Sequence, residues 1–111
     1  MLKARLIFRK GTKISENLCL SKDLGVILKV TSGVFPRFEK QVSLWWQKGL
    51  VAGYGDEIED AIEGFFEAVE FDYEFLKDKK DSEIGGNLPR VRSSIMSFVT
   101  TVKVNEKEKG G

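Results

Sequence analysis

The chain has 111 residues, of which 41% are hydrophobic and 32% are charged, a balance typical of one folded domain. It contains no histidine and a single cysteine, Cys19, which excludes an intramolecular disulfide, the usual zinc sites and catalytic groups built on histidine. No apolar run approaches the ~20 residues that span a bilayer, and no apolar signal core follows Met1. We therefore expect a cytoplasmic protein without a metal or cofactor.

The formal net charge of +1 conceals an uneven distribution of charge along the chain. Ten of the 17 acidic residues lie between Asp56 and Asp78, where Lys77 is the only base. The rest of the chain is therefore strongly basic. This asymmetry predicts two surfaces of opposite charge, and it concerns what approaches the protein more than how the protein folds.

Three segments in the first half of the chain have the patterns of β-strands. Residues 2–9 alternate between an apolar face and a largely basic face, and residues 25–31 form a second strand. A third strand is expected over residues 42–47, continuing to 50–52 and entering a turn at Gly53-Tyr54-Gly55.

From Asp56 the hydrophobic period changes to 3.6 residues, which predicts one amphipathic helix over residues 56–78. We expect Asp56 to cap the free amides at the start of the helix, with Glu59 as its partner in a capping box. The residues at helical spacing that are expected to face the core are Ile58, Ala61, Ile62, Phe65, Val69, Tyr73 and Leu76.

The last third of the chain begins with a polar, glycine-containing loop over residues 78–87. Alternation over residues 91–104 then predicts a final strand, followed by a flexible charged tail at 105–111. We therefore expect a single α+β domain over residues 1–104. It would have a mainly antiparallel sheet of about four strands with one long helix on one face, in the order β-β-β-α-β.

The start of the predicted helix carries a recognisable motif. Gly55, Asp56, Ile58, Glu59 and Ala61 stand at the spacing of a Gly-Asp-Thr-apolar-Glu-Glu-Ala pattern that follows a strand and opens a helix, with Asp60 as a conservative variant. In this respect the chain resembles the HicB family of antitoxin-like proteins. The match is centred on Gly53 to Ile62 and covers about a third of the chain when the following acidic-aromatic helix is included.

The resemblance implies a non-catalytic domain that binds and masks a small, basic toxin ribonuclease. Glu57 stands where the family usually has a threonine, and Lys48-Gly49 replaces a Pro-Gly turn that many members carry. No DNA-binding extension follows the predicted final strand, so we expect either no autoregulation or regulation through another chain.

The acidic face of the predicted helix is the candidate surface for such a partner, because carboxylates complement a basic surface and speed encounter with it. An ordinary solvated helix face is the alternative interpretation. The predicted partner-binding residues are Glu63, Glu67 and Glu70, with Trp45 and Trp46 as aromatic anchors.

A second apolar stripe on the same helix consists of Gly64, Ala68, Phe71 and Phe75. One sheet cannot easily cover two stripes of one helix, so this stripe predicts a homodimer interface. Cover by the loop at residues 10–23 or by the C-terminal segment is the alternative.

The alternative function is binding of single-stranded DNA or RNA. Lys3, Arg5, Arg9, Lys29 and Lys103 fall on the strand faces opposite the expected core. Successive strand residues point to opposite faces, so one of the two adjacent tryptophans must join them. A cationic sheet with an aromatic platform can bind a single strand by stacking and phosphate contact. A solvated face with a covered tryptophan is the competing interpretation.

Overall fold

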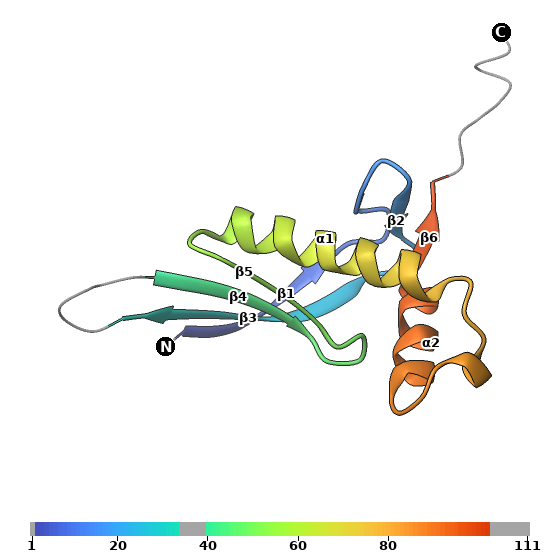
Figure 1. The fold of residues 1–111 in the computed structure, drawn as a ribbon. Helices are drawn as coiled ribbons and strands as arrows, with labels where there is room; N and C mark the ends of the chain where they lie inside the picture. Colours follow the sequence, from blue (N-terminus) through green and yellow to red (C-terminus); the bar gives the residue numbers. More distant parts are fainter. Residues whose placement is uncertain (1, 34–39, 103–111) are drawn as a thin grey trace, which may run out of the picture.

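The computed structural model describes residues 2–33 and 40–102. A four-stranded antiparallel sheet forms one layer, helix α1 lies across one face of it, and helix α2 stands at one end (Figure 1). This arrangement confirms the α+β class and the mainly antiparallel sheet. The predicted tail at 105–111 and Lys103 lie outside the described residues.

The sheet has the strand order β1-β3-β4-β5. Residues paired across neighbouring strands share one face, so the register defines which side chains point toward the helix. Leu6 pairs with Val26, and Leu28 pairs with Leu44, which places the apolar residues of three strands on the α1 side. The strand bounds are Leu2–Phe8 for β1, Leu24–Ser32 for β3, Lys40–Trp46 for β4 and Val51–Gly55 for β5.

Residues 40–55 form a hairpin, where the sequence pattern had predicted one interrupted strand. The connection is a tight turn at residues 47–50, in which the amide of Leu50 donates to the carbonyl of Gln47 at 3.1 Å. Gly49 lies directly against the ring of Trp46, so a side chain at position 49 would collide with the indole. Only four residues separate the apolar end of β4 from the apolar start of β5, so the sequence pattern resembles that of one strand.

Helix α1 spans Ile58–Leu76 and confirms the predicted amphipathic helix. It packs so closely on β5 that a Cβ atom at Gly53 would collide with the backbone of Ala61 and Phe65. A Cβ atom at Gly55 would likewise collide with the start of the helix. Gly53 and Gly55 are therefore strand residues whose missing side chains let α1 approach β5. The turn predicted at Gly53-Tyr54-Gly55 is wrong.

The predicted capping box at the start of α1 is not formed. Glu57 occupies the N-cap position and makes no side-chain hydrogen bond to the free amides. Its carboxylate instead accepts from Nζ of Lys40 at 2.8 Å, which ties the start of the helix to strand β4.

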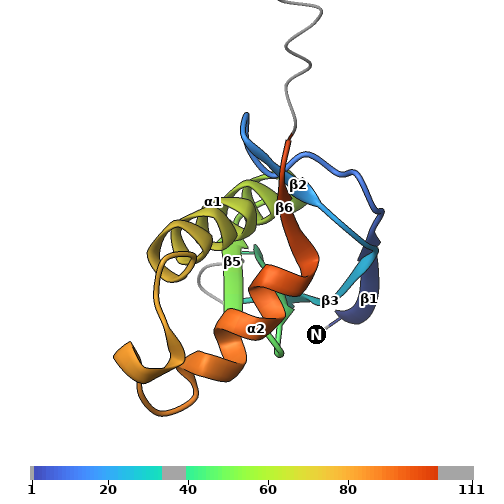
Figure 2. The ribbon, with the colours of Figure 1, turned by 90° about the vertical axis from the view of Figure 1, so that its right-hand side faces the viewer.

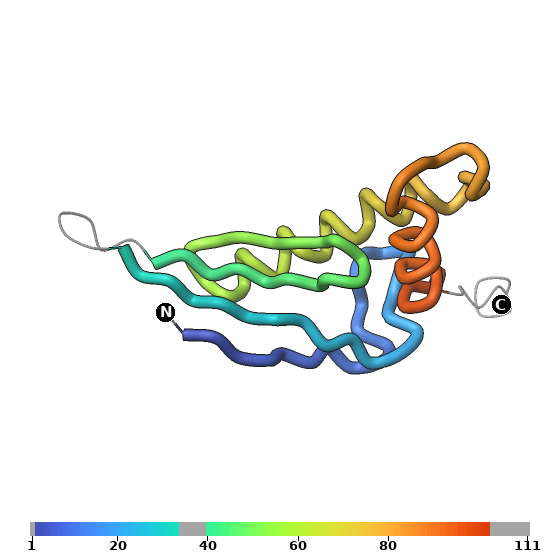
Figure 3. Tube along the Cα trace, turned by 90° about the horizontal axis from the view of Figure 1, so that it is seen from below, coloured from blue at the N-terminus to red at the C-terminus, as the bar shows by residue number. Residues whose placement is uncertain are grey.

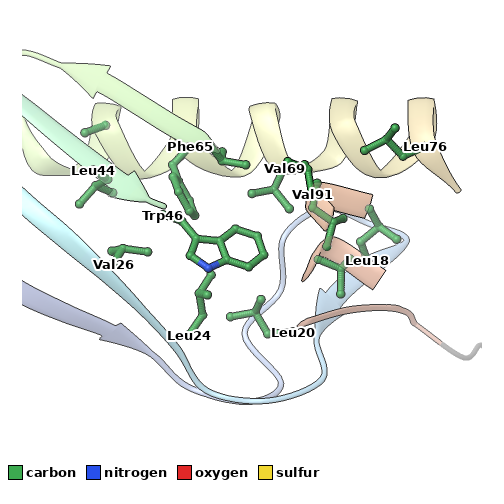
Figure 4. Close-up of a cluster of buried hydrophobic side chains, with 14 of the residues drawn as sticks. Leu18, Leu20, Leu24, Val26, Leu44, Trp46, Phe65, Val69, Leu76 and Val91 are labelled. Carbon is green, nitrogen blue, oxygen red and sulfur yellow. The ribbon is translucent and has the colours of Figure 1, made fainter. Parts of the chain in front are cut away.

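The core lies between the sheet, α1 and α2, with Trp46 at its centre (Figure 4). The indole of Trp46 is 4% exposed and meets the ring of Phe98 edge-on, with centroids 5.2 Å apart. Phe65 and Val69 of α1 pack above it, and Leu24 of β3 packs below it in the view of Figure 4. The apolar stripe predicted for α1 therefore faces the core.

The final strand predicted over residues 91–104 is correct for Val99–Thr101 and wrong for the residues before them, while 103–104 lie outside the described residues. Helix α2 spans Leu88–Phe98, and the three-residue strand β6 spans Val99–Thr101. Pro89 suits the first turn of a helix because its missing amide would be unpaired there anyway. Val91 and Ile95, four residues apart, are buried on the same helix face.

A small second sheet lies at the same end of the molecule as α2 (Figure 1). Strand β6 pairs antiparallel with β2, Leu18–Leu20, which the sequence pattern did not reveal (Figure 2). Leu18, Leu20 and Val99 are buried, whereas Cys19 between the two leucines is half-buried and carries a free thiol. A short 3-10 helix at Asp81–Glu83 lies in the loop between the two main helices.

Helix α2 is tied to the end of α1 by one side chain. Nε of Arg92 donates to the carbonyl of Leu76 at 3.0 Å, and Nη2 donates to the carbonyl of Lys77 at 3.4 Å. The carbonyl of Leu76 also accepts from the amide of Lys79 at 3.0 Å, and a cation is favourable at the negative end of a helix. Arg92 therefore fixes how the two helices meet.

Candidate binding surfaces

Two outer surfaces of the molecule are candidates for binding, the exposed side of α1 and the sheet face turned away from α1. Within residues 2–33 and 40–102, no helix is long and apolar enough to cross a membrane. The same residues contain no group of three or more side chains arranged to hold a metal ion.

Helix α1 carries seven carboxylates and no base in its 19 residues. Five of them form a row on its outer side, which we call the acidic row: Glu59, Glu63, Glu67, Glu70 and Glu74. Four of the five side chains are exposed and Glu70 is half-buried. Glu74 pairs with Lys77 at 2.9 Å, an exposed contact just beyond the helix. The three glutamates predicted to bind a partner thus lie together.

Large apolar side chains lie exposed beside the acidic row. Phe71 is 71% exposed and Phe75 is 51% exposed on α1, Leu50 is 60% exposed in the β4–β5 turn, and Leu88 is 39% exposed at the start of α2. We call these four residues the apolar patch. They line a groove of about 290 Å³ together with Asp72. A contiguous exposed apolar patch with a charged border is typical of an interaction site.

The structure divides the predicted dimer stripe into two pairs. Gly64 faces the backbone of β5, where a Cβ atom would sit 3.5 Å from the carbonyl oxygen of Tyr54, and Ala68 packs partly buried against the core. Both residues are half-buried against the chain's own fold, and their assignment to a subunit interface stays a prediction. Phe71 and Phe75 remain exposed.

Two residues of the groove have unusual local properties. Leu50 has a φ of 51°, in the left-handed region that glycine and asparagine adopt more readily than leucine. Asp72 is half-buried, and this burial raises the pKa of its carboxyl above the ordinary value. A strained exposed leucine and a partly desolvated carboxylate both cost stability, so both positions merit a functional explanation.

The sheet face turned away from α1 is open. Figure 3 shows the four strands from this side, with α1 behind them and no other described element over their middle. The register places on it Lys3, Arg5, Ile7, Gly25, Ile27, Lys29, Thr31, Gln41, Ser43, Trp45, Ala52 and Tyr54. We call this surface the open sheet face.

Cations and aromatics are ordered across the open sheet face. Lys3 stands directly opposite Lys29, and one row further along Arg5 stands opposite Ile27. Trp45 and Tyr54 lie on the other two strands and meet edge-on, with ring centroids 6.2 Å apart and an interplanar angle of 89°. The basic side chains therefore lie beside an aromatic pair.

The aromatic anchors predicted for the basic partner are not on α1. Trp46 belongs to the core, so its prediction as a binding residue is wrong. Trp45 is 40% exposed on the open sheet face, on the opposite side of the sheet from the acidic row. Arg9 follows the end of β1, where its carbonyl accepts from the amide of Thr12 in the turn.

Sequence patterns did not find Leu50, Leu88, Tyr54 or Arg92. Leu50 and Leu88 come from a turn and a helix start far apart in the chain, so no periodicity joins them to Phe71. The sequence pattern predicted a turn at Tyr54. Strand alternation through this position would instead have predicted that Tyr54 lies on the same sheet face as Trp45. Arg92 was placed on a strand, which removed it from the helix end that it binds.

No protein-family model, curated protein or solved structure matches this chain. The inference of function therefore rests on the two surfaces and on the motif at the start of α1.

Proposed function

We propose that this chain is a non-catalytic, HicB-like antitoxin-type protein whose α1 surface binds and masks a small basic protein. The observation that carries this proposal is the juxtaposition of exposed Phe71 and Phe75 with the acidic row. A solvated helix face explains the carboxylates alone, but it gives no reason for two exposed phenylalanines beside them.

The apolar patch and the acidic row have different roles in binding. Phe71 and Phe75 are the expected hot spots, because burying an aromatic side chain in a partner's pocket removes a large apolar area from water. The carboxylates of the acidic row lie at the border of the patch, where charges mainly set the rate of encounter and the choice of partner. Affinity therefore comes from the patch and selectivity for a basic partner comes from the row.

The acidic row favours a basic partner over a second copy of this chain. A homodimer built on Phe71 and Phe75 would bring two acidic rows to one interface, whereas a basic partner brings the opposite charge. Masking follows directly if the partner is a small ribonuclease. Such a protein holds the RNA backbone with cations, and the acidic row would occupy those cations in place of phosphate.

Site-specific photo-crosslinking in the host cell tests this proposal. A photoreactive amino acid replaces Phe71 in one protein and Tyr54 of the open sheet face in a matched control, since both side chains are exposed. We expect position 71, and not position 54, to give one discrete adduct with a small basic protein. An adduct with a second copy of this chain, or with an acidic protein, would overturn the proposal, and so would the absence of any discrete adduct.

Mutation of the surface separates the two roles. Glu67→Lys combined with Glu70→Lys is expected to slow association with the crosslinked partner, and the effect should shrink as salt is raised. Phe71→Ala is expected to speed dissociation instead. Surface plasmon resonance with the purified partner measures both rates. Equal, salt-independent effects of the two changes would argue against this division of roles.

A further inference from the structure

We infer that the open sheet face is a binding site for single-stranded nucleic acid. Bases would stack on Trp45 and Tyr54, while Lys3, Arg5 and Lys29 would hold the phosphates. This site lies on the opposite side of the sheet from α1, so it is independent of the partner proposed for the acidic row.

The charges on the open sheet face are all positive, and they lie on β1 and β3. In the described part of the chain, none of the residues that the register places on this face is acidic. Two carboxylates border this face. Asp56 lines a hollow together with Tyr54, and Asp23 borders a hollow of about 650 Å³ that Arg5, Trp45 and Lys48 also line. Asp23 is the one beside the cations. Its Oδ1 accepts from the backbone amide of Lys10 at 2.7 Å, so this carboxylate already has a partner.

One feature of the cations has a cost that an anion would remove. Lys3 and Lys29 stand directly opposite each other on neighbouring strands, where like charges destabilise the pairing of a sheet. The guanidinium of Arg5 lies over Gly25 with its Nε–Nη2 edge toward the backbone, since a Cβ atom at Gly25 would be 3.1 Å from Nε and Nη2 and 3.5 Å from Cζ. Gly25 pairs with Ile7, on the side of Arg5 away from Lys3, and its missing side chain leaves room for Arg5 to lie along the sheet.

The aromatic pair supplies the second half of the site. A tryptophan that is 40% exposed and a tyrosine that is 52% exposed lie together on an uncovered face. Neighbouring strands are about 4.8 Å apart, so Trp45 is roughly 10 Å from Arg5 across β3. A nucleotide chain lying along the sheet can therefore place its phosphates over β1 and β3 and its bases over β4 and β5.

The arrangement favours a single strand over other anionic ligands. In a duplex the faces of the bases are stacked on one another and are closed to a protein ring, whereas a single strand offers every face. An anionic membrane would satisfy the lysines, but it has no planar group to stack on Trp45.

Fluorescence anisotropy with labelled oligo(dT) and oligo(U) of about 16 nucleotides tests the inference, because this length covers the usual site sizes. We expect saturable binding that weakens with salt. Trp45→Ala is expected to weaken it about 5- to 100-fold by removing one stacking partner. Arg5→Glu is expected to lower the slope of log K against log salt by about 0.7 for its lost phosphate contact. Comparison of the two probes tells whether a 2′-hydroxyl contributes.

The matched control for Arg5→Glu is Lys13→Glu, which makes the same change in charge at an exposed position outside the open sheet face. Tyr54→Leu provides a second stacking variant, so the inference does not depend on the folding of Trp45→Ala alone. Anionic vesicles containing phosphatidylserine provide the competing ligand. The inference is overturned if no saturable binding occurs at low salt, if Lys13→Glu acts as strongly as Arg5→Glu, or if vesicles displace both oligonucleotides.

Discussion

Leu50 illustrates how one residue can work against stability and so indicate a function. Its left-handed backbone costs roughly 1 kcal/mol relative to glycine or asparagine, and its side chain is largely exposed. Neither property helps the fold. Both are explained if the side chain is held out at the edge of the groove for a partner.

Leu50→Asn is therefore expected to leave the free energy of unfolding unchanged or to raise it by up to about 1 kcal/mol, because asparagine tolerates this φ. The same change should reduce the yield of the crosslink formed from position 71. Urea denaturation measures the first effect. A loss of stability greater than about 1 kcal/mol would show that Leu50 supports the fold, and not the surface.

The burial of Asp72 predicts how the free energy of unfolding depends on pH. Burial raises the pKa of its carboxyl above 3.8, so the folded state disfavours the ionised form. Stability should be lost as pH rises from the unfolded pKa to the higher folded pKa, because the folded state there binds more protons. Asp72→Asn should therefore be more stable than the parent at neutral pH, and this difference should vanish below about pH 3.

The control for Asp72→Asn is Glu63→Gln, which removes a carboxylate from an exposed position of the same helix. Thermal unfolding across the pH range compares the two. An equal gain in both variants would identify the summed charge of α1, and not the burial of Asp72, as the cause.

The sequence identified part of the candidate sites at this scale. Helical spacing shows that Phe71 and Phe75 lie on a second apolar face of the helix, which one core cannot bury together with the first face. The alternation of strands required one tryptophan on each face, but it could not decide which one, since no sequence pattern fixes the parity of β4. The partners of these residues come from other elements and became visible only when the chain was folded.

At the scale of elements, the contact between α1 and β5 determines how the helix sits on the sheet. Gly53→Ala is expected to destabilise the fold by about 1–3 kcal/mol or more, because the new methyl group meets backbone atoms that cannot move independently. Gly64→Ala is the matched change on the helix side. It should stabilise the fold by about 0.5–1 kcal/mol, since its methyl group reaches ordinary contact distance and alanine favours the helix. Equal effects of the two changes, measured by chemical denaturation, would contradict this packing.

Arg92 connects the two helices. Arg92→Ala is expected to cost about 1–3 kcal/mol, because it removes charge-assisted hydrogen bonds to two carbonyls at the end of α1. Hydrogen exchange should become faster in the last turn of α1 and the first turns of α2. Arg90→Ala, an exposed arginine on the same helix, is the control and should leave exchange unchanged. Unchanged exchange in Arg92→Ala would argue against this role.

Element types were predictable where one pattern persisted. The period of α1 holds over 19 residues and identifies it without ambiguity. The segment at 88–101 combines a short helix with a three-residue strand, and its alternating Met96 and Phe98 suggested a strand throughout. Pro89 was the local signal for a helix start. The hairpin at 40–55 and the pairing of β2 with β6 depend on contacts that a short apolar run does not specify.

At the scale of the whole molecule, a net charge near zero hides two separate fields. The acidic row and the open sheet face lie on opposite sides of one sheet, so ligands of opposite charge need not compete for the same surface. The apolar patch adds affinity to the α1 surface beyond the effect of its charge. The aromatic pair does the same for the open sheet face.

Amide chemical-shift mapping by NMR tests this separation most directly, with oligolysine and oligo(dT) titrated into the same labelled protein. Oligolysine is expected to shift the amides of α1 between Glu59 and Glu74. Oligo(dT) is expected to shift those of β1, β3, β4 and β5, and each shift should persist when the other ligand is present. Shifts of the same amides by both ligands, or displacement of one ligand by the other, would contradict the account.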